Sequence, residues 1–321
     1  MALSRTQCGI AAGFAAIYVI WGSTYLALAL ALQSLPPYLL MAARCLIGGA
    51  ILYGCAAVTG SVKPSWRTCV LAAVCGVLFF VGCHGVLADA QQRVPSGLAA
   101  ILLATIPLWI TLLQALVPGA QRPTSRTIAW LFPGVAGVAL IAWRKATSGA
   151  SAVGAADVLL LLGASFSWAA GTFISERHSH AFPPMPLSGL ELLAGGLVLL
   201  AISAARGELG ALHLSAVSAV SMIGWTYLTL IGTVVAFAAF NWLLKHVSPT
   251  LVATYTFVNP VIAVLLGWAF LGETPTLWML VGAVLIIASV AGLLLARGRS
   301  GRMEKKSSST QIPVRPAPAR P

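Results

Sequence analysis

The chain has 321 residues, of which 59% are hydrophobic and only 8% are charged, and its formal net charge is +12. A soluble globular domain carries roughly 25% charged residues, so this composition excludes a soluble fold. The six cysteines form no CxxC pair, and the sequence predicts no metal site and no cofactor.

Ten apolar runs are long enough to be membrane helices, because a bilayer core of about 30 Å needs roughly 20 helical residues. They lie at 8–32, 37–59, 68–90, 95–117, 126–143, 155–175, 185–205, 216–243, 248–271 and 276–296. The runs are continuously apolar and lack the alternation of membrane strands. The sequence therefore predicts an all-α polytopic membrane protein with ten transmembrane helices, the first of which is too long for a signal peptide.

Aromatic residues mark the first and sixth runs, where Trp21 and Trp168 lie 147 positions apart. Tyr18 and Tyr25 flank Trp21 at neighbouring helix positions. We expect Trp21, Tyr25 and Trp168 to form an aromatic cavity wall. The alternative is interhelical packing or anchoring at the membrane interface, where Trp and Tyr are common.

Ionisable residues interrupt the second and seventh runs at equivalent places, as Arg44 and Glu191. A charged group inside a membrane helix costs several kcal/mol, about 2.5–3.5 by insertion scales, and normally faces the interior of the bundle. One hypothesis places the two residues on opposite sides of a cavity, where they hold the two ends of a zwitterion. The other gives each a backbone or hydroxyl partner near its helix end.

The third run contains His84 and Asp89, separated by the residues GVLA. A histidine base oriented by an aspartate could activate a hydroxyl, and the spacing is similar to that of the catalytic pair of glycerolipid acyltransferases. Residues five apart on a helix point in different directions, so we expect a polar group near the membrane interface and no enzyme. A membrane-embedded enzyme, or a lipid-handling protein using His84 and Asp89, remains the alternative function.

Prolines occur at matched positions in the fourth and ninth runs, as Pro107 and Pro260, and each removes a backbone hydrogen bond and kinks its helix. We expect both to be hinges. Tyr255 and Asn259 share one helix face just before Pro260, and both are candidate cavity residues.

Basic residues concentrate on the side of the N-terminus and in the segment after residue 297. The positive-inside rule then predicts that both termini are cytoplasmic, and this distribution speaks against nucleic acid as a partner. Residues 297–321 are basic and rich in Ser and Pro, so the sequence predicts a disordered tail that contacts membrane lipids.

The chain repeats itself with an offset of about 147 residues, as Pro36-Pro37 and Pro183-Pro184 illustrate. The repeats predict two units, at 8–145 and 153–296. Repeats of this size in a membrane chain are typical of transporters that bind a small-molecule substrate between two halves. No nucleotide-binding G-x4-G-K-[ST] motif occurs in the sequence, so we expect a gradient to drive transport, with Glu191 and Asp89 as candidates for proton coupling.

Three blocks give the chain a family resemblance: IYVIWGSTYLA at 17–27, VPSGLAAILLATIPLW at 94–109 and VSPTLVATYTFVNPVIAVLLGWAFLGE at 247–273. They resemble the EamA-type drug/metabolite transporter superfamily, and within it the YedA-like exporters. This resemblance implies two inverted five-helix repeats, a central cavity, cytoplasmic termini in the inner membrane, and export of small metabolites such as amino acids or toxic compounds. The third helix departs from the family pattern at Gly82-Cys83-His84 and Asp89-Ala90, so no substrate contact there is carried over.

Overall fold

In the computed structural model the described residues are 5–58, 63–118, 123–147, 154–178, 182–247, 252 and 254–308. Every regular element within these ranges is a helix. Seven helical spans are long and apolar enough to cross a membrane, and three shorter apolar helices accompany them, at Ser125–Ile141, Tyr255–Leu271 and Leu277–Leu293. They coincide with the ten predicted runs. The chain is therefore an all-α polytopic membrane protein, which confirms the predicted fold class.

The first half of the chain supplies five spans. They are α1 (Arg5–Ala31), α2 (Pro37–Val58), a third span of α3 (Trp66–Gly76), η1 (Val77–Gly85) and α4 (Val86–Ala90), a fourth of α5 (Ser96–Leu103) and α6 (Ile106–Leu116), and a fifth of α7 (Ser125–Ala129) and α8 (Leu131–Thr147). Hydroxyl caps begin the third and fifth spans, where Ser65 and Thr124 accept backbone N–H groups of the first helical turn.

The second half supplies five more spans. They are α9 (Ala155–His178), α10 (Pro184–Ala205), then, after the short α11 (Glu208–Ala211) and η2 (Leu214–Ala216), an eighth span of α12 (Ala219–Thr226), η3 (Tyr227–Val235) and α13 (Ala236–His246), and finally α15 (Tyr255–Leu271) and α16 (Leu277–Ser308). Helix α16 runs on to Ser308, where the sequence predicts a disordered tail from residue 297. Met, Glu, Lys and Arg in this stretch are good helix formers and prolong the helix. The rest of the predicted tail lies outside the described residues.

The third and eighth spans each contain a nine-residue π-helical stretch, η1 and η3, at equivalent places in the two halves. A π-helical turn changes which face the following residues present, and such turns are frequent at functional sites. The sequence analysis, which assumed regular α-helices, did not predict them.

The helix contacts are symmetric under exchange of the two halves. Helix α2 packs on α10, and α8 packs on α16, so each of these helices meets its own counterpart. Helix α1 of the first half packs on the ninth span (α15) and the eighth span of the second half. Its counterpart α9 packs on the equivalent fourth and third spans of the first half. Each half crosses the membrane five times. Because five is odd, the second half begins on the opposite side of the membrane from the first. This arrangement is that of inverted repeats.

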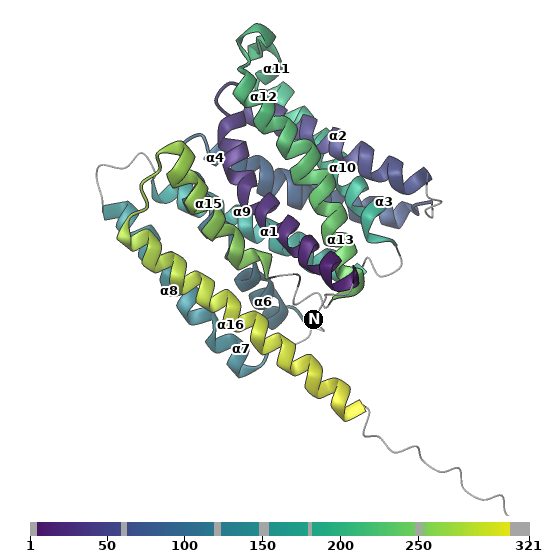
Figure 1. The fold of residues 1–321 in the computed structure, drawn as a ribbon, viewed down its shortest axis with the longest axis vertical. Helices are drawn as coiled ribbons and strands as arrows, with labels where there is room; N and C mark the ends of the chain where they lie inside the picture. The colour runs from purple at the N-terminus through teal and green to yellow at the C-terminus, as the bar shows by residue number, and fades with distance from the viewer. Residues whose placement is uncertain are drawn as a thin grey trace, which may run out of the picture.

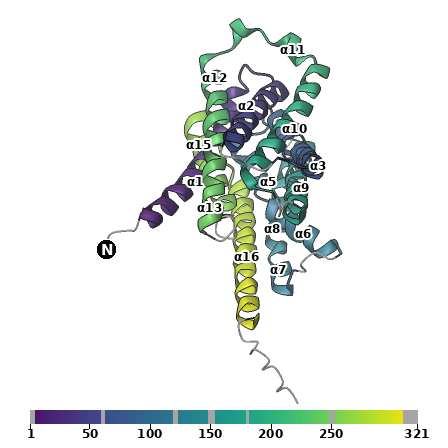
Figure 2. The same ribbon diagram turned by 90° about the vertical axis from the view of Figure 1, so that its right-hand side faces the viewer.

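The fifth and tenth spans form a pair beside the main bundle. Figure 1 shows α8 and α16 side by side along one edge, and Figure 2 shows α11 at the far end of the molecule, between α10 and α12. A Cβ atom added at Gly137 would lie 2.6 Å from the Gly282 carbonyl oxygen. Glycine at both positions therefore lets the two helices approach closely, as small residues do in membrane bundles.

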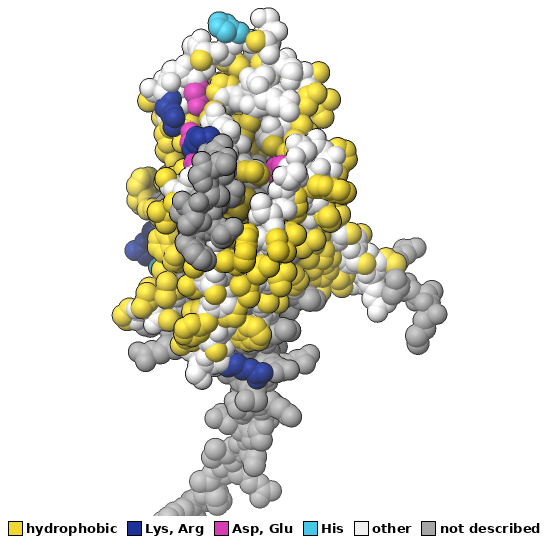
Figure 3. Space-filling view, turned by 90° about the vertical axis from the view of Figure 1, so that its left-hand side faces the viewer, with side chains coloured by type: hydrophobic (Ala, Val, Ile, Leu, Met, Phe, Trp, Pro, Cys, Tyr) yellow, Lys and Arg dark blue, Asp and Glu magenta, His cyan; other side chains and the backbone are white. Residues whose placement is uncertain are grey.

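Large apolar side chains remain exposed on the outside of the bundle, including Phe132, Trp268 and Phe270. Figure 3 shows hydrophobic side chains over most of one face, with acidic side chains toward the end that carries α11 and Lys or Arg side chains both there and farther down. We call the end that carries this helix the α11 end. A broad apolar surface is expected of a chain surrounded by lipid.

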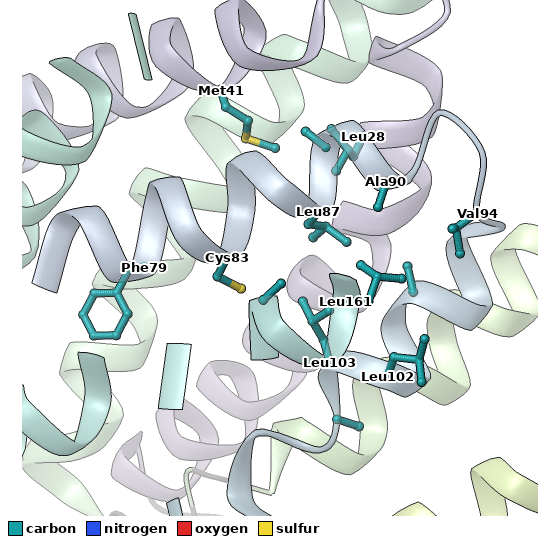
Figure 4. Packing of buried hydrophobic residues seen from close by; sticks show 14 of the residues in the cluster. Leu28, Met41, Phe79, Cys83, Leu87, Ala90, Val94, Leu102, Leu103 and Leu161 are labelled. Atoms are coloured by element: carbon teal, nitrogen blue, oxygen red, sulfur yellow. The ribbon is translucent and has the colours of Figure 1, made fainter. Parts of the chain in front are cut away.

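Buried residues from the first eight spans and the tenth form the main hydrophobic core. Figure 4 shows Leu28, Met41, Leu87 and Leu161 packed together with Cys83 and Leu103. The last two side chains also line the cavity described below. The core therefore fixes one wall of that cavity.

Candidate functional site

A cavity of about 890 Å³, part of it open to solvent, lies inside the bundle. Residues of both halves line it: Trp21, Thr24, Tyr25, Arg44, Phe80, Cys83, His84, Ala100, Leu103, Ala104 and Ile106 from the first, and Trp168, Phe237, Phe240, Tyr255, Thr256, Asn259 and Pro260 from the second. Six of the seven cavity residues proposed from the sequence are among them.

One aromatic cluster surrounds Trp21 and joins the first span to the eighth and ninth. The Trp21 ring centroid lies 4.6 Å from that of Tyr255, 5.3 Å from Phe240 and 5.8 Å from Phe237. Its Nε1–H donates to the Gly232 carbonyl of η3 at 3.1 Å. This bond satisfies the polar edge of the indole and leaves the ring as an apolar wall.

A second aromatic cluster surrounds Trp168 and joins the sixth span to the third. The Trp168 ring centroid lies 4.6 Å from that of Phe79, 5.0 Å from His84 and 6.3 Å from Phe80. Phe80 and His84 stack at 5.6 Å with 26° between their planes. The two tryptophans at equivalent sequence positions thus each hold an aromatic cluster on the cavity wall.

Arg44 brings a positive charge to the cavity, although its side chain is only 6% exposed. Its Nε donates to the Thr233 hydroxyl at 2.9 Å, and its Nη1 lies 3.8 Å from the Met41 sulfur. Gly48 permits this contact, because a Cβ atom there would lie 2.8 Å from Thr233 Cγ2. The ion pairs found among the described residues involve Arg93 and Arg206, and none of them involves Arg44.

Glu191 does not share the cavity lining with Arg44. It lies where α10 packs on α3, close enough that a Cβ atom at Gly76 would collide with the Glu191 carbonyl. The side chain is 6% exposed, and its Oε1 has no hydrogen-bond partner among the described residues. Because the halves are related by symmetry, Arg44 of α2 faces the eighth span while Glu191 of α10 faces the third. The two residues are equivalent in position but do not face each other.

His84 lines the cavity, which the sequence reasoning did not anticipate. Its Nδ1 lies 3.1 Å from the Phe79 carbonyl oxygen. Because a carbonyl only accepts, Nδ1 carries a proton, and in the neutral imidazole Nε2 is then a hydrogen-bond acceptor. Asp89 instead pairs with Arg93 at 3.3 Å and with Arg206 at 3.5 Å. The His84 and Asp89 side chains therefore do not form the catalytic pair that the alternative function requires.

Asn259 lines the cavity one turn after Tyr255, as the sequence predicts for one helix face. Its Oδ1 is buried and has no hydrogen-bond partner within the described ranges. Pro260 also reaches the cavity, inside the continuous helix α15. Pro107 is not among the lining residues, but the fourth span breaks just before it, between α5 and α6.

Several cavity residues carried no recognisable signal in the sequence. Phe80, Phe237 and Phe240 lie in long apolar runs, where a phenylalanine in the wall looks like any other packing residue. Thr24 could have been noticed, because it lies next to Tyr25 in the family-like block at 17–27.

Charged residues form a cluster at the α11 end, between the loops of both halves. Arg93 bonds to Asp157 at 3.2 Å and to Asp89, and Arg206 lies over the Tyr38 ring at 4.8 Å. We call Asp89, Arg93, Asp157 and Arg206 the ion cluster. Nearby, Glu273 accepts the Ser96 and Gly97 N–H groups at 2.5 and 3.0 Å. A carboxylate there satisfies the free donors at the start of α5.

A membrane bundle of two inverted repeats around a cavity lined by both is typical of membrane transporters. The chain belongs to the EamA-like transporter family, whose profile matches residues 9–143 and 156–295. It is accordingly a multi-pass membrane transporter.

Two curated relatives cover most of the chain. The inner membrane transporter YedA of Escherichia coli (strain K12) is 34% identical over 278 residues, which are 84% of this chain and 86% of YedA. Protein PecM of Dickeya dadantii is 28% identical over 279 residues, 84% of this chain and 87% of PecM. A crystal structure with 22% sequence identity superposes with a TM-score of 0.61 and covers 90% of this chain and 99% of its own. This last likeness supports the fold alone.

Proposed function

We propose that the protein is a secondary active transporter of the inner membrane that exports small metabolites, such as amino acids, related compounds or drugs, by alternating access. The cavity is its substrate site. The observation that carries this proposal is that both halves build the walls, with Trp21, Arg44 and His84 from one and Trp168, Tyr255 and Asn259 from the other. Rocking one half against the other would rearrange such a site and expose it to either side in turn.

Contacts between the halves provide the elements that such a motion would change. Trp21 bonds to Gly232 and Arg44 bonds to Thr233, so two cavity residues of the first half are held by η3 of the second. The break before Pro107 and the proline Pro260 inside α15 border the same cavity from the two halves. We propose that these are the hinges, since each interrupts the regular backbone ladder.

The orientation with both termini in the cytoplasm rests on the distribution of Lys and Arg. In that orientation the α11 end is periplasmic. The ion cluster then lies on the periplasmic side of the cavity, and the C-terminal part of α16, which is rich in Arg and Lys, lies near the anionic cytoplasmic leaflet. Fusions of a reporter active only in the periplasm, placed after residues 210 and 321, test this orientation.

Glu191 is the proton-coupling site that we propose. Of the two candidates from the sequence, Asp89 is engaged by two arginines, whereas Glu191 is a buried carboxyl group without an ion-pair partner among the described residues. Glu191→Gln should abolish accumulation driven by a proton gradient and leave gradient-free exchange intact. Loss of both, or of neither, in protein that reaches the membrane contradicts this assignment.

Counterflow in proteoliposomes tests the proposed function. Vesicles are loaded with pools of unlabelled metabolites, and uptake of the labelled compounds is followed for wild type, Trp21→Ala and Trp268→Ala. Both variants replace a tryptophan by alanine, but Trp21 lines the cavity whereas Trp268 is exposed on the outside of the bundle. We expect saturable exchange that only Trp21→Ala impairs. Absence of exchange from every pool would speak against a metabolite carrier.

A further inference from the structure

We propose that the cavity selects a small organic anion: a carboxylate with a flat aromatic body and a neutral hydrogen-bond donor, bound with its carboxylate on Arg44. This inference rests on the proposed function and names its substrate class.

Charge is the first argument. Arg44 is buried in the cavity wall, and the lining contains no Asp or Glu. Among the described residues its nearest oxygen partner is a hydroxyl, that of Thr233, which uses only Nε. A buried guanidinium without a counter-charge is costly, and its planar donors match a carboxylate. A bound anion supplies the missing charge.

The apolar walls are the second argument. The Trp21 and Tyr255 rings meet edge to face with 4.6 Å between their centroids, and the Phe240 and Tyr255 ring centroids are 6.2 Å apart. Across the lining, Phe80 stacks with His84 beside Trp168. Aromatic rings favour offset or edge contacts with other rings, so these walls suit a flat, largely apolar body.

The hydrogen-bond acceptors in the lining are the third argument. Asn259 Oδ1 is buried without a hydrogen bond in the described part of the chain, and His84 presents Nε2 as an acceptor because Nδ1 donates to Phe79. Leaving a buried acceptor unpaired costs about 1–3 kcal/mol, so a ligand that brings an O–H or N–H donor is favoured.

A zwitterion fits this site less well than an anion. One hypothesis from the sequence had Glu191 hold an ammonium group, but Glu191 lies on the contact of α10 with α3, outside the lining. An ammonium group in the cavity would meet aromatic rings and neutral acceptors, and no carboxylate would offset its loss of hydration. We therefore expect an amino acid to bind more weakly than the hydroxy acid with the same skeleton.

Five ligands that share a phenyl ring test the proposal on purified wild-type protein. They are 3-phenyllactate (anion with a hydroxyl), 3-phenylpropanoate (anion without a donor), phenylalanine (zwitterion), 3-phenylpropanamide (neutral) and phenethylamine (cation). Binding is followed by calorimetry. We expect phenyllactate to bind tightest, phenylpropanoate next, and the other three at least about tenfold more weakly than phenyllactate, as an uncompensated buried charge requires. Equal or tighter binding of phenylalanine or phenethylamine, or no binding of either anion, overturns the proposal.

Two variants and one transport assay complete the test. Arg44→Gln should remove the preference for anions, while Arg126→Gln, which removes an arginine from α7 outside the lining, should keep it. If Arg44→Gln does not fold, the ligand series on wild type decides alone.

The same ligands are then tried in counterflow. Anion-selective binding without exchange of any compound contradicts the proposed function but supports the site, whereas exchange with the reverse charge preference contradicts the site and supports the function.

Discussion

Arg44 of the first half donates from Nε to the Thr233 hydroxyl of the second half over 2.9 Å. Thr233 in turn donates to the Leu228 carbonyl, five residues earlier in the π-helical stretch η3, at 3.0 Å. The π-helical turn therefore fixes the hydroxyl that orients the cavity arginine. These two hydrogen bonds connect the cavity wall to the contact between the repeats.

Replacing Thr233 by valine should weaken substrate binding by about tenfold or more, since a hydrogen bond to a charged group contributes about 1.5–3 kcal/mol. Valine keeps the shape but cannot accept the Arg44 proton. Thr229→Val is the matched control, because Thr229 is buried in the same stretch and its hydroxyl donates to the Trp225 carbonyl on its own span. The KM for exchange measures the effect. Equal KM values for the two variants contradict the role of Thr233.

Close packing of α2 on α10 depends on Gly49. A Cβ atom there would lie 2.9 Å from the Gly189 carbonyl oxygen and 2.9 Å from Leu192 Cβ. Gly49→Ala should therefore destabilise the protein by about 1–3 kcal/mol, the usual cost of overpacking. Gly54→Ala, on the same helix with nothing within 4 Å of the added atom, should be neutral or slightly stabilising. Thermal unfolding in detergent compares them, and equal melting temperatures would refute the argument.

The apolar runs predicted the helices well, because a membrane helix must satisfy its backbone internally and needs a fixed length of apolar residues. The repeat placed Trp21 and Trp168 at equivalent positions, and both line the cavity. Helix spacing likewise predicted a common face for Tyr255 and Asn259. These features follow from apolar run length, helix periodicity and the internal repeat, all of which can be read from the sequence.

Other features depend on how helices face each other, which the sequence did not reveal. Arg44 and Glu191 are equivalent in the repeat, and the two-fold relation turns them toward different spans. The π-helical stretches shift the face of the third span, so His84 reaches the cavity while Asp89 reaches the ion cluster. A shift of one residue rotates a helical side chain by about 100°, enough to move it from lipid to cavity.

The ion cluster should control access to the cavity from the α11 end more than it controls stability. Its arginines are 45% and 53% exposed, and exposed ion pairs contribute only about 0–1 kcal/mol. Asp157→Asn should therefore leave the melting temperature nearly unchanged. The access itself is measured in a background that keeps Cys83, a buried cavity residue, as its single cysteine. In that background Asp157→Asn should speed the labelling of Cys83 by an impermeant thiol reagent added at the α11 end.

High salt gives an independent check on the ion cluster. Salt screens exposed ion pairs, so labelling of Cys83 in the parent should also speed up as ionic strength rises. The Asp157→Asn variant should respond less, because one of its pairs is already absent. Identical labelling rates for parent and variant at every salt concentration would show that the cluster is not a gate.

His84→Phe should separate the acceptor of His84 from its ring. Phenylalanine preserves the aromatic contacts with Phe80 and Trp168 but removes Nε2. We expect weaker binding of 3-phenyllactate and unchanged binding of 3-phenylpropanoate, which has no donor for that acceptor. The sequence predicted a polar group near the membrane interface, whereas the structure places His84 in the cavity lining. Equal losses for both ligands would indicate that the ring, not the acceptor, matters.

Gradient-free counterflow with Arg44→Gln beside Arg126→Gln is the most direct test of the central claim that the cavity between the repeats is the transport site. Both variants remove one arginine, but only Arg44 lines the cavity. We predict saturable exchange in wild type and Arg126→Gln, and exchange lost or greatly reduced in Arg44→Gln at equal amounts of folded protein in the vesicles. Exchange by Arg44→Gln with an unchanged rate and KM would contradict the account.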